Sequence, residues 1–131
     1  FEFYSKDSLG KVYICHDTCT LEVRSCRQIR KDKATLPMDQ VRTSLARLME
    51  IHHTGMPQVH GFVEDFRNFY ILSALAPGVE VMDRIQDALQ QNQILTEAWV
   101  AGIIRQVLEV LAWCYSQSTG PVMHGDLKPD N

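Results

Sequence analysis

The stretch His124-Gly125-Asp126-Leu127-Lys128-Pro129-Asp130-Asn131 places acidic, basic and amide side chains at short intervals. Pro129 opposes a helix, so these side chains are expected on a loop. There Asp126 could accept the proton of an attacking hydroxyl, Lys128 could bind a transferred phosphoryl group, and Asn131 could bind a metal ion. The spacing therefore indicates phosphoryl transfer, and the alternative is a polar turn without chemistry.

Length and composition predict a globular chain. It has 131 residues, 45% hydrophobic and 22% charged, which is enough apolar sequence for a core. A net charge of -3 argues against nucleic acid or an anionic membrane as the main partner. No apolar run approaches the roughly 20 residues of a membrane span, and no signal-peptide pattern opens the chain. We expect an intracellular, cytoplasmic protein that binds proteins or small molecules, without nucleic acid or membrane partners.

The four cysteines, Cys15, Cys19, Cys26 and Cys114, lack the spacing of a disulfide framework. They are typical of reduced and partly buried thiols in an intracellular protein. Cys15, His16, Cys19 and Cys26, together with His52 and His53, leave a zinc-dependent interaction module as an alternative. No regular second ligand pair completes a tetrahedral set, so buried cysteines are the preferred interpretation.

Local patterns predict five strands and three helices. Aromatic and β-branched residues between turn residues predict strands at 1–4, 11–16, 20–29, 59–64 and 68–74. Apolar residues at helical spacing predict a helix through Val41 and Leu45 that ends by Gly55, and a second helix over 79–91. A third helix is predicted over 96–117, with Thr96 as its N-cap and an apolar stripe expected in the core.

Five strands, a helix after the third, two further helices and then H-x-D-x-K-x-x-N resemble the protein kinase superfamily in its serine/threonine branch. The similarity is greatest to calcium/calmodulin-dependent and calcium-dependent protein kinases. It is carried by Phe62-Val63-Glu64-Asp65, by Phe69-Tyr70-Ile71-Leu72, and by Glu80 ahead of Met82-Asp83. The resemblance implies an α+β protein-kinase-like fold. Residues 1–76 would form the N-lobe, a five-stranded antiparallel sheet with one helix, and the hinge; residues 77–131 would begin a truncated C-lobe.

The resemblance also implies ATP and Mg²⁺ as cofactors and assigns roles to particular residues. Asp126 and Lys128 are the catalytic candidates, Asn131 is the metal candidate, and His124 is expected to be structural and buried. The candidates for nucleotide binding are Gly10 in the glycine-rich loop, Val12 for adenine, Arg27 for the phosphates, Ser73 at the back of the adenine site, Leu75 in the hinge and Glu80 for ribose.

Several positions depart from the family pattern. Ser5 and Asp7 stand where two of the three loop glycines are expected, so phosphate binding should weaken. Arg27 replaces the lysine that holds phosphate, and Ser44 replaces its glutamate partner, so the ion pair cannot form. Gly125 replaces an arginine that reads activation-loop phosphorylation, so this control should not apply.

Two functional hypotheses follow. The first is a calcium-dependent-kinase-like serine/threonine kinase-domain fragment with impaired ATP binding, pseudokinase-like and acting through protein contacts. The alternative is an active, atypical ATP-dependent kinase in the full-length protein, with a protein substrate. The 131-residue fragment itself is expected to be inactive, because no D-F-G segment follows Asn131. Its apolar third helix also predicts self-association of the fragment.

Overall fold

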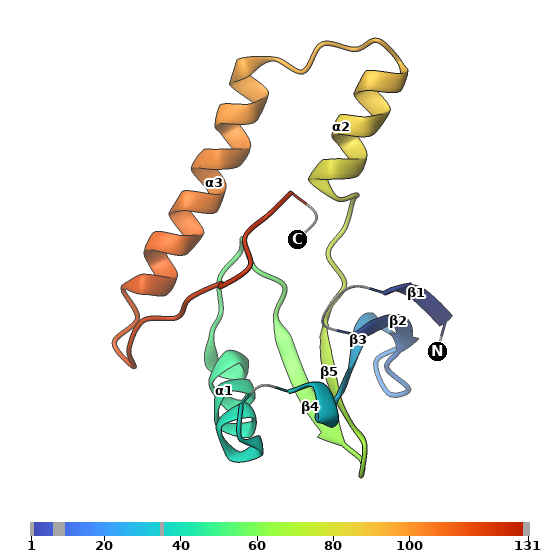
Figure 1. The fold of residues 1–131 in the computed structure, drawn as a ribbon, viewed down its shortest axis with the longest axis vertical. Helices are drawn as coiled ribbons and strands as arrows, with labels where there is room; N and C mark the ends of the chain where they lie inside the picture. Colours follow the sequence, from blue (N-terminus) through green and yellow to red (C-terminus); the bar gives the residue numbers. More distant parts are fainter. Residues whose placement is uncertain (1, 7–9, 35, 130–131) are drawn as a thin grey trace. The chain divides into compact units, whose positions relative to one another are not determined.

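The computed structural model describes residues 2–6, 10–34 and 36–129 (Figure 1). The chain divides into two compact units, Phe1–Ala76 and Pro77–Asn131. The first unit contains strands β1 (Glu2–Lys6), β2 (Lys11–His16), β3 (Val23–Arg30), β4 (Val59–Glu64) and β5 (Asn68–Ala74), the 3-10 turn η1 (Lys31–Lys33) and helix α1 (Met38–Glu50). The second unit contains helices α2 (Val81–Gln90) and α3 (Glu97–Tyr115).

The strands of the first unit form one antiparallel sheet in the order β1-β2-β3-β5-β4. The chain crosses from β3 through η1 and α1 to the edge strand β4 before it returns to β5 beside β3. This order places β3 at the centre of the sheet, with β2 on one side and β5 on the other. The five-stranded antiparallel sheet with one helix confirms the predicted fold class.

The core of the first unit lies on both sides of the central strands. Cys26 on β3 is 2% exposed and Phe69 on β5 is 1% exposed, while Leu45 is the buried residue of α1. Helix α1 contacts β4. Full burial of a side chain such as that of Phe69 stabilises the folded state by about 1.5–3 kcal/mol. The sheet and α1 therefore bury apolar surface within the first unit itself.

Strand β3 begins at Val23 rather than at the predicted position 20, because a turn occupies the preceding residues. The Asp17 carboxylate accepts hydrogen bonds from the backbone N–H of Cys19 at 2.8 Å and of Thr20 at 3.0 Å. Leu21 adopts a positive φ of 59°. Side-chain bonds of this kind stabilise a turn at the expense of the strand. The other altered boundaries are small, such as β1 running to Lys6 rather than ending at residue 4.

Helix α3 of the second unit begins as predicted, since Thr96 Oγ1 accepts a hydrogen bond from the backbone N–H of Trp99 at 3.2 Å. The expectation that its apolar stripe lies in the core was only partly right. Trp99 is half-buried, as are Ile103, Val107 and Leu111, which follow at intervals of four residues. Ile104 is 52% exposed and Leu108 is 58% exposed. The helix thus presents an apolar face that the described residues leave uncovered.

Candidate functional site

The nucleotide-binding candidates of the first unit centre on Arg27 of β3. In the sheet register Arg27 lies directly opposite Val12 on β2 and directly opposite Ile71 on β5. Residues directly opposite each other in antiparallel strands share one face of the sheet. Val12, Arg27 and Ile71 are all half-buried. The fold therefore places the candidate for adenine contact and the candidate for phosphate contact side by side on one face.

Gly10 has a structural reason to be glycine. A Cβ atom at this position would lie 2.0 Å from the carbonyl oxygen of Gln28 on β3 and 3.0 Å from its carbonyl carbon. The close approach of two backbones therefore requires glycine with or without a nucleotide. Ser5, at a second position of the expected glycine loop, belongs to β1, and Asp7 lies outside the described residues.

Ser73 lies near the end of β5, opposite Ser25 on β3 and opposite Val59 on β4. The Ser25 hydroxyl donates a hydrogen bond to the Ser73 carbonyl oxygen at 3.4 Å. Both serines are half-buried and small, so this part of the face has little side-chain bulk. Leu75 follows β5 and is 37% exposed. The structure thus keeps Ser73 near the Val12 and Arg27 face but leaves Leu75 at the surface.

Ser44, which stands where the family's glutamate is expected, is exposed on α1. Two carboxylates share this helix, but both lie on other sides of it. At about 100° per residue, Asp39 and Glu50 are roughly 140° and 120° from Ser44 around the axis. Asp39 is also occupied, since its Oδ1 accepts a hydrogen bond from Arg42 Nη1 at 2.9 Å. Helix α1 therefore offers no acidic side chain on its Ser44 face.

A different set of charges holds α1 to the sheet. Arg42 of α1 donates two hydrogen bonds to Glu64 of β4, from Nε at 2.8 Å and from Nη2 at 3.1 Å. The Lys31 ammonium also donates to Glu64, and to the carbonyl oxygen of Asp65 at 2.6 Å. The hydrogen bonds from Arg42 and then Lys31 lower the pKa of Glu64 to about 2.

We call Arg42, Glu64 and Lys31 the Glu64 cluster. The sequence did not predict this cluster, because Arg42 and Lys31 lie 22 and 33 residues from Glu64 along the chain. Glu64 was considered only as part of a family motif. The available signal was an ordinary one: a basic residue on the polar face of a helix and an acidic residue at the end of a strand. The cluster fixes α1 on the sheet without using Arg27 or Ser44.

The catalytic candidates of the second unit lie on the loop that follows α3. Lys128 Nζ is 3.2 Å from Asp126 Oδ2, and the two side chains are 41% and 53% exposed. A carboxylate beside an ammonium group at this distance can accept a proton while the cation binds an anionic group. The loop therefore brings together the two predicted catalytic residues. Asn131, the metal candidate, lies outside the described residues.

The backbone of this loop is shaped by local bonds. Gly125 has a φ of 79°, in the left-handed region where a side chain such as arginine is strained. The backbone N–H of Asp126 donates a hydrogen bond to His124 Nδ1 at 3.3 Å, and His124 is exposed rather than buried as predicted. The backbone N–H of Met82 donates to the carbonyl oxygen of Pro129 at 3.2 Å. This last bond ties the loop to the first turn of α2.

Glu80, the candidate for ribose contact, occupies the N-cap position of α2. Its carbonyl oxygen accepts a hydrogen bond from the backbone N–H of Arg84 at 3.1 Å. The residue is exposed, so its carboxylate is accessible to solvent. Gly78, two residues before it, has a φ of 105°. The chain entering α2 is therefore shaped by a glycine turn that leaves Glu80 on the surface.

The cysteines do not assemble a zinc site. Cys15, Cys26 and Cys114 are buried, and Cys19 is exposed on the turn before β3. Burial raises the pKa of the Cys26 thiol, and the neighbouring Cys15 raises it further. Within residues 2–6, 10–34 and 36–129, no group of three or more His, Cys, Asp or Glu side chains is placed to hold a metal ion. Three of the four thiols are thus small buried side chains, and Cys19 is not.

Comparison with known proteins identifies a domain family, curated relatives and a solved structure that resemble this chain. The protein kinase domain family matches residues 6–131. Calcium-dependent protein kinase 22 of Arabidopsis thaliana is 29% identical over 96% of this chain, and calcium-dependent protein kinase 10 of the same plant is 30% identical over 96%. The crystal structure of Rad53 1–466 in complex with AMP-PNP matches with a TM-score of 0.82 and 25% identity, over 99% of this chain and 32% of that chain. The chain spans 25% and 22% of the length of the two plant kinases.

Helix α3 also meets the length and composition of a membrane span, with 19 residues and a mean hydropathy of 1.2 over its most apolar window. This differs from the expectation that no apolar run approaches that length. Mostly buried core helices of globular domains meet the same criteria, whereas 6% of this window of α3 is buried. The whole of α3 lies within residues 6–131, which match the domain family.

Proposed function

Because the chain belongs to the protein kinase family, with residues 6–131 matching its domain, we propose that it is part of a calcium-dependent-kinase-like domain whose ATP binding is impaired. Such a domain would act mainly through contacts with other proteins, as a pseudokinase does. We place the full-length protein in the cytoplasm. Nucleic acid and membrane are not among its proposed partners.

The observation that carries this proposal is that α1 has no carboxylate on the side where Ser44 lies. A kinase of ordinary type pairs a lysine of the third strand with a glutamate of the following helix. Here Arg27 occupies the strand position, and Ser44 is an exposed hydroxyl without a carboxylate. The loss of charge-assisted contacts worth roughly 1.5–3 kcal/mol each should weaken ATP-Mg binding about tenfold to a hundredfold.

A second candidate function rests on the loop after α3. Lys128 and Asp126 lie within 3.2 Å of each other, which suits proton acceptance beside a phosphoryl group. With Arg27 on the phosphates and Mg²⁺ on Asn131, the full-length protein would be an active, atypical serine/threonine kinase. ATP, with its Mg²⁺, would then supply the phosphoryl group, and Asp126 would accept the proton of the substrate hydroxyl.

Calorimetric titration of the full-length protein with ATP-Mg separates the two candidates. We expect weak binding by the unmodified protein. The double variant Arg27→Lys with Ser44→Glu should bind more tightly by more than the sum of the single changes. Arg27→Lys alone has no carboxylate to pair with, and Ser44→Glu alone meets a guanidinium that does not replace the lysine ammonium. Asp39→Asn is the matched control, since that carboxylate belongs to another side of α1.

The opposite result is equally clear. If the unmodified protein binds ATP-Mg at low micromolar concentration and phosphorylates a peptide, and Asp126→Asn abolishes the phosphorylation, the impaired-binding proposal fails. The protein would then be the atypical kinase.

A further inference from the structure

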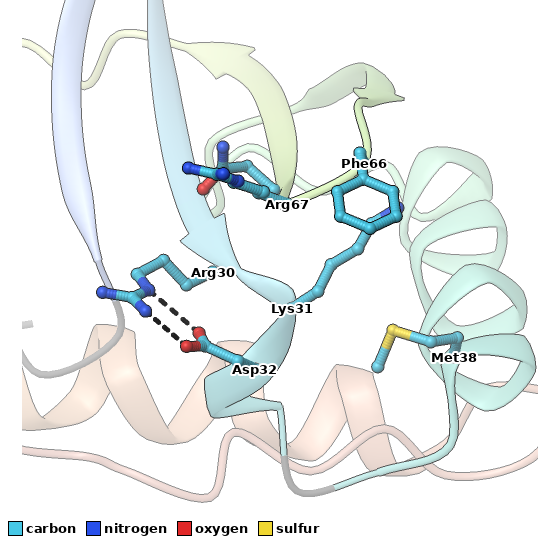
Figure 2. A pocket seen from close by; sticks show the side chains of 7 residues that line it. Arg30, Lys31, Asp32, Met38, Phe66 and Arg67 are labelled. Carbon is cyan, nitrogen blue, oxygen red and sulfur yellow. Dashed lines mark hydrogen bonds and ion pairs between the residues drawn. The ribbon is translucent and has the colours of Figure 1, made fainter.

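A hollow of about 760 Å³ opens at one end of the sheet in the first unit (Figure 2). Its lining comes from the end of β3, from η1, from the start of α1 and from the turn between β4 and β5. The lining side chains used below are Arg30, Lys31, Asp32, Met38, Phe66 and Arg67. None of them is a candidate for nucleotide binding or catalysis, so the hollow is a separate feature of the surface.

The turn that carries Phe66 and Arg67 is held in one conformation. The Asp65 carboxylate accepts hydrogen bonds from the backbone N–H of Arg67 at 2.7 Å, from that of Asn68 at 2.7 Å, and from the Tyr70 hydroxyl at 2.8 Å. The backbone N–H of Lys31 donates to the carbonyl oxygen of Arg67 at 2.8 Å. A partner that binds here would therefore pay little entropy for ordering the turn.

Phe66 is 93% exposed on this fixed turn, and Met38 lines the same hollow from the start of α1. Figure 2 shows both apolar side chains on the side of the hollow toward α1. A single exposed aromatic side chain is ordinary on a protein surface. Here, however, a Phe on a fixed turn lines the same hollow as a Met and an Arg. This is the composition of an interface centre, where these residue types are enriched.

The charged side chains around the hollow indicate the charge of a partner that would bind there. Arg30 forms an ion pair with Asp32, and Lys31 is engaged by the Glu64 cluster. The Arg67 guanidinium has no ion-pair partner among residues 2–6, 10–34 and 36–129. Arg67 is therefore the cationic side chain of the lining that an incoming carboxylate can pair with. A carboxylate of an acidic segment could pair with Arg67, whereas a basic segment would meet a like charge there.

We propose that the hollow docks an acidic segment of a partner protein. A carboxylate of that segment pairs with Arg67, and a neighbouring aromatic or aliphatic side chain packs against Phe66 and Met38. The inference rests on the proposed function, action through protein contacts, and it names the chemistry of the partner.

The test is fluorescence anisotropy of the full-length protein with a labelled peptide Glu-Glu-Phe-Glu-Glu. We expect Phe66→Ser and Arg67→Ala each to weaken binding by about fivefold or more, because truncation at an interface centre has effects of this size. Both changes leave the backbone N–H groups that bind the Asp65 carboxylate. The matched controls are Leu21→Ser, an exposed apolar residue on another turn, and Arg105→Ala, an exposed arginine on α3. They should change the affinity less than about twofold.

Three outcomes would overturn the inference. These are no binding at about 1 mM peptide, equal binding of a Lys-Lys-Phe-Lys-Lys peptide, or equal loss in the control variants. If Phe66→Ser and Arg67→Ala instead abolish self-association of the protein, the occupant is a second copy and the acidic-partner inference fails. ATP-Mg titration of the same samples reports on the proposed function independently. Tight nucleotide binding with peptide binding that depends on Phe66 would remove the proposed function and keep the docking site.

Discussion

The two units of this chain differ in how their apolar side chains are buried. In the first unit, pairing of the strands brings distant side chains together, and Cys26, Leu45 and Phe69 are buried within it. In the second unit, Ala88 and Cys114 are the buried apolar residues among those described. A helix satisfies its backbone hydrogen bonds internally, so α2 and α3 complete this bonding whether or not their apolar faces are covered. Regular secondary structure alone therefore does not tell whether a unit is packed.

The less packed second unit agrees better with the site residues of the family than the packed first unit does. The first unit is packed, but Arg27 and Ser44 depart from the family pattern. The second unit exposes a long apolar helix, yet it keeps Asp126 beside Lys128. The packing of a unit and its agreement with the family pattern are therefore independent of each other in this chain.

The largest expected effect concerns the exposed face of α3. We expect the 131-residue fragment to self-associate at micromolar concentration, because each large apolar side chain left bare forfeits about 1.5–3 kcal/mol. Ile104→Glu with Leu108→Glu should shift it toward a monomer, whereas Leu21→Glu in the first unit should not. Light scattering measures the mass. A monodisperse monomer of the unmodified fragment would show that α3 is not the unsatisfied surface.

The next effect tests the packing of the first unit at Gly10. Gly10→Ala places a Cβ against the backbone of Gln28, so we expect a loss of about 1–3 kcal/mol in the free energy of unfolding. Gly61→Ala on β4 is the matched control, since a Cβ there meets nothing within 4 Å. Thermal denaturation of the full-length protein measures both variants. Equal melting temperatures would mean that β2 and β3 are not held as closely as described.

A smaller effect should follow pH through Glu64. Its pKa in the folded protein is about 2, below the ordinary value of 4.5, so the stabilisation from its ion pairs is present above about pH 4.5 and is lost as the pH falls toward 2. Glu64→Gln should therefore lower the urea midpoint at pH 7 and matter progressively less below pH 4.5. Glu50→Gln, at the end of α1, is the control and should give no such trend. A difference independent of pH would separate the Glu64 cluster from the stability of α1.

The smallest effect on the fold is expected at Ser73. Ser73→Met should leave the melting temperature nearly unchanged, because the position is half-buried and faces the small Ser25. It should nevertheless abolish binding of adenine analogues that carry a large aromatic substituent, if the full-length protein binds them, by filling the space beside the Val12 face. Competition binding measures this. Equal binding before and after the exchange would show that the residue assigned to the back of the site is the wrong one.

The sequence by itself determined the family, the order of the elements and several boundaries. Strands β2, β4 and β5 have the predicted bounds, and Thr96 caps α3 as expected. These features depend on residues within a few positions of one another, which is the range over which turn residues, caps and apolar periodicity act. The proximity of Asp126 and Lys128 also depends on nearby residues, since the two are two positions apart on one loop.

Only the tertiary structure decided which surfaces are covered and which charges meet. Arg42 and Glu64 are separated by 22 residues, and Gly10 approaches Gln28 across two strands. The exposure of Leu108 on α3 and the hollow beside Phe66 likewise depend on what the rest of the chain brings near them. Local sequence patterns do not predict such contacts, because the same residues can form the same helix or strand with or without a distant contact. Burial and long-range pairing are properties of the folded arrangement, and there the apolar and charged side chains acquire their partners.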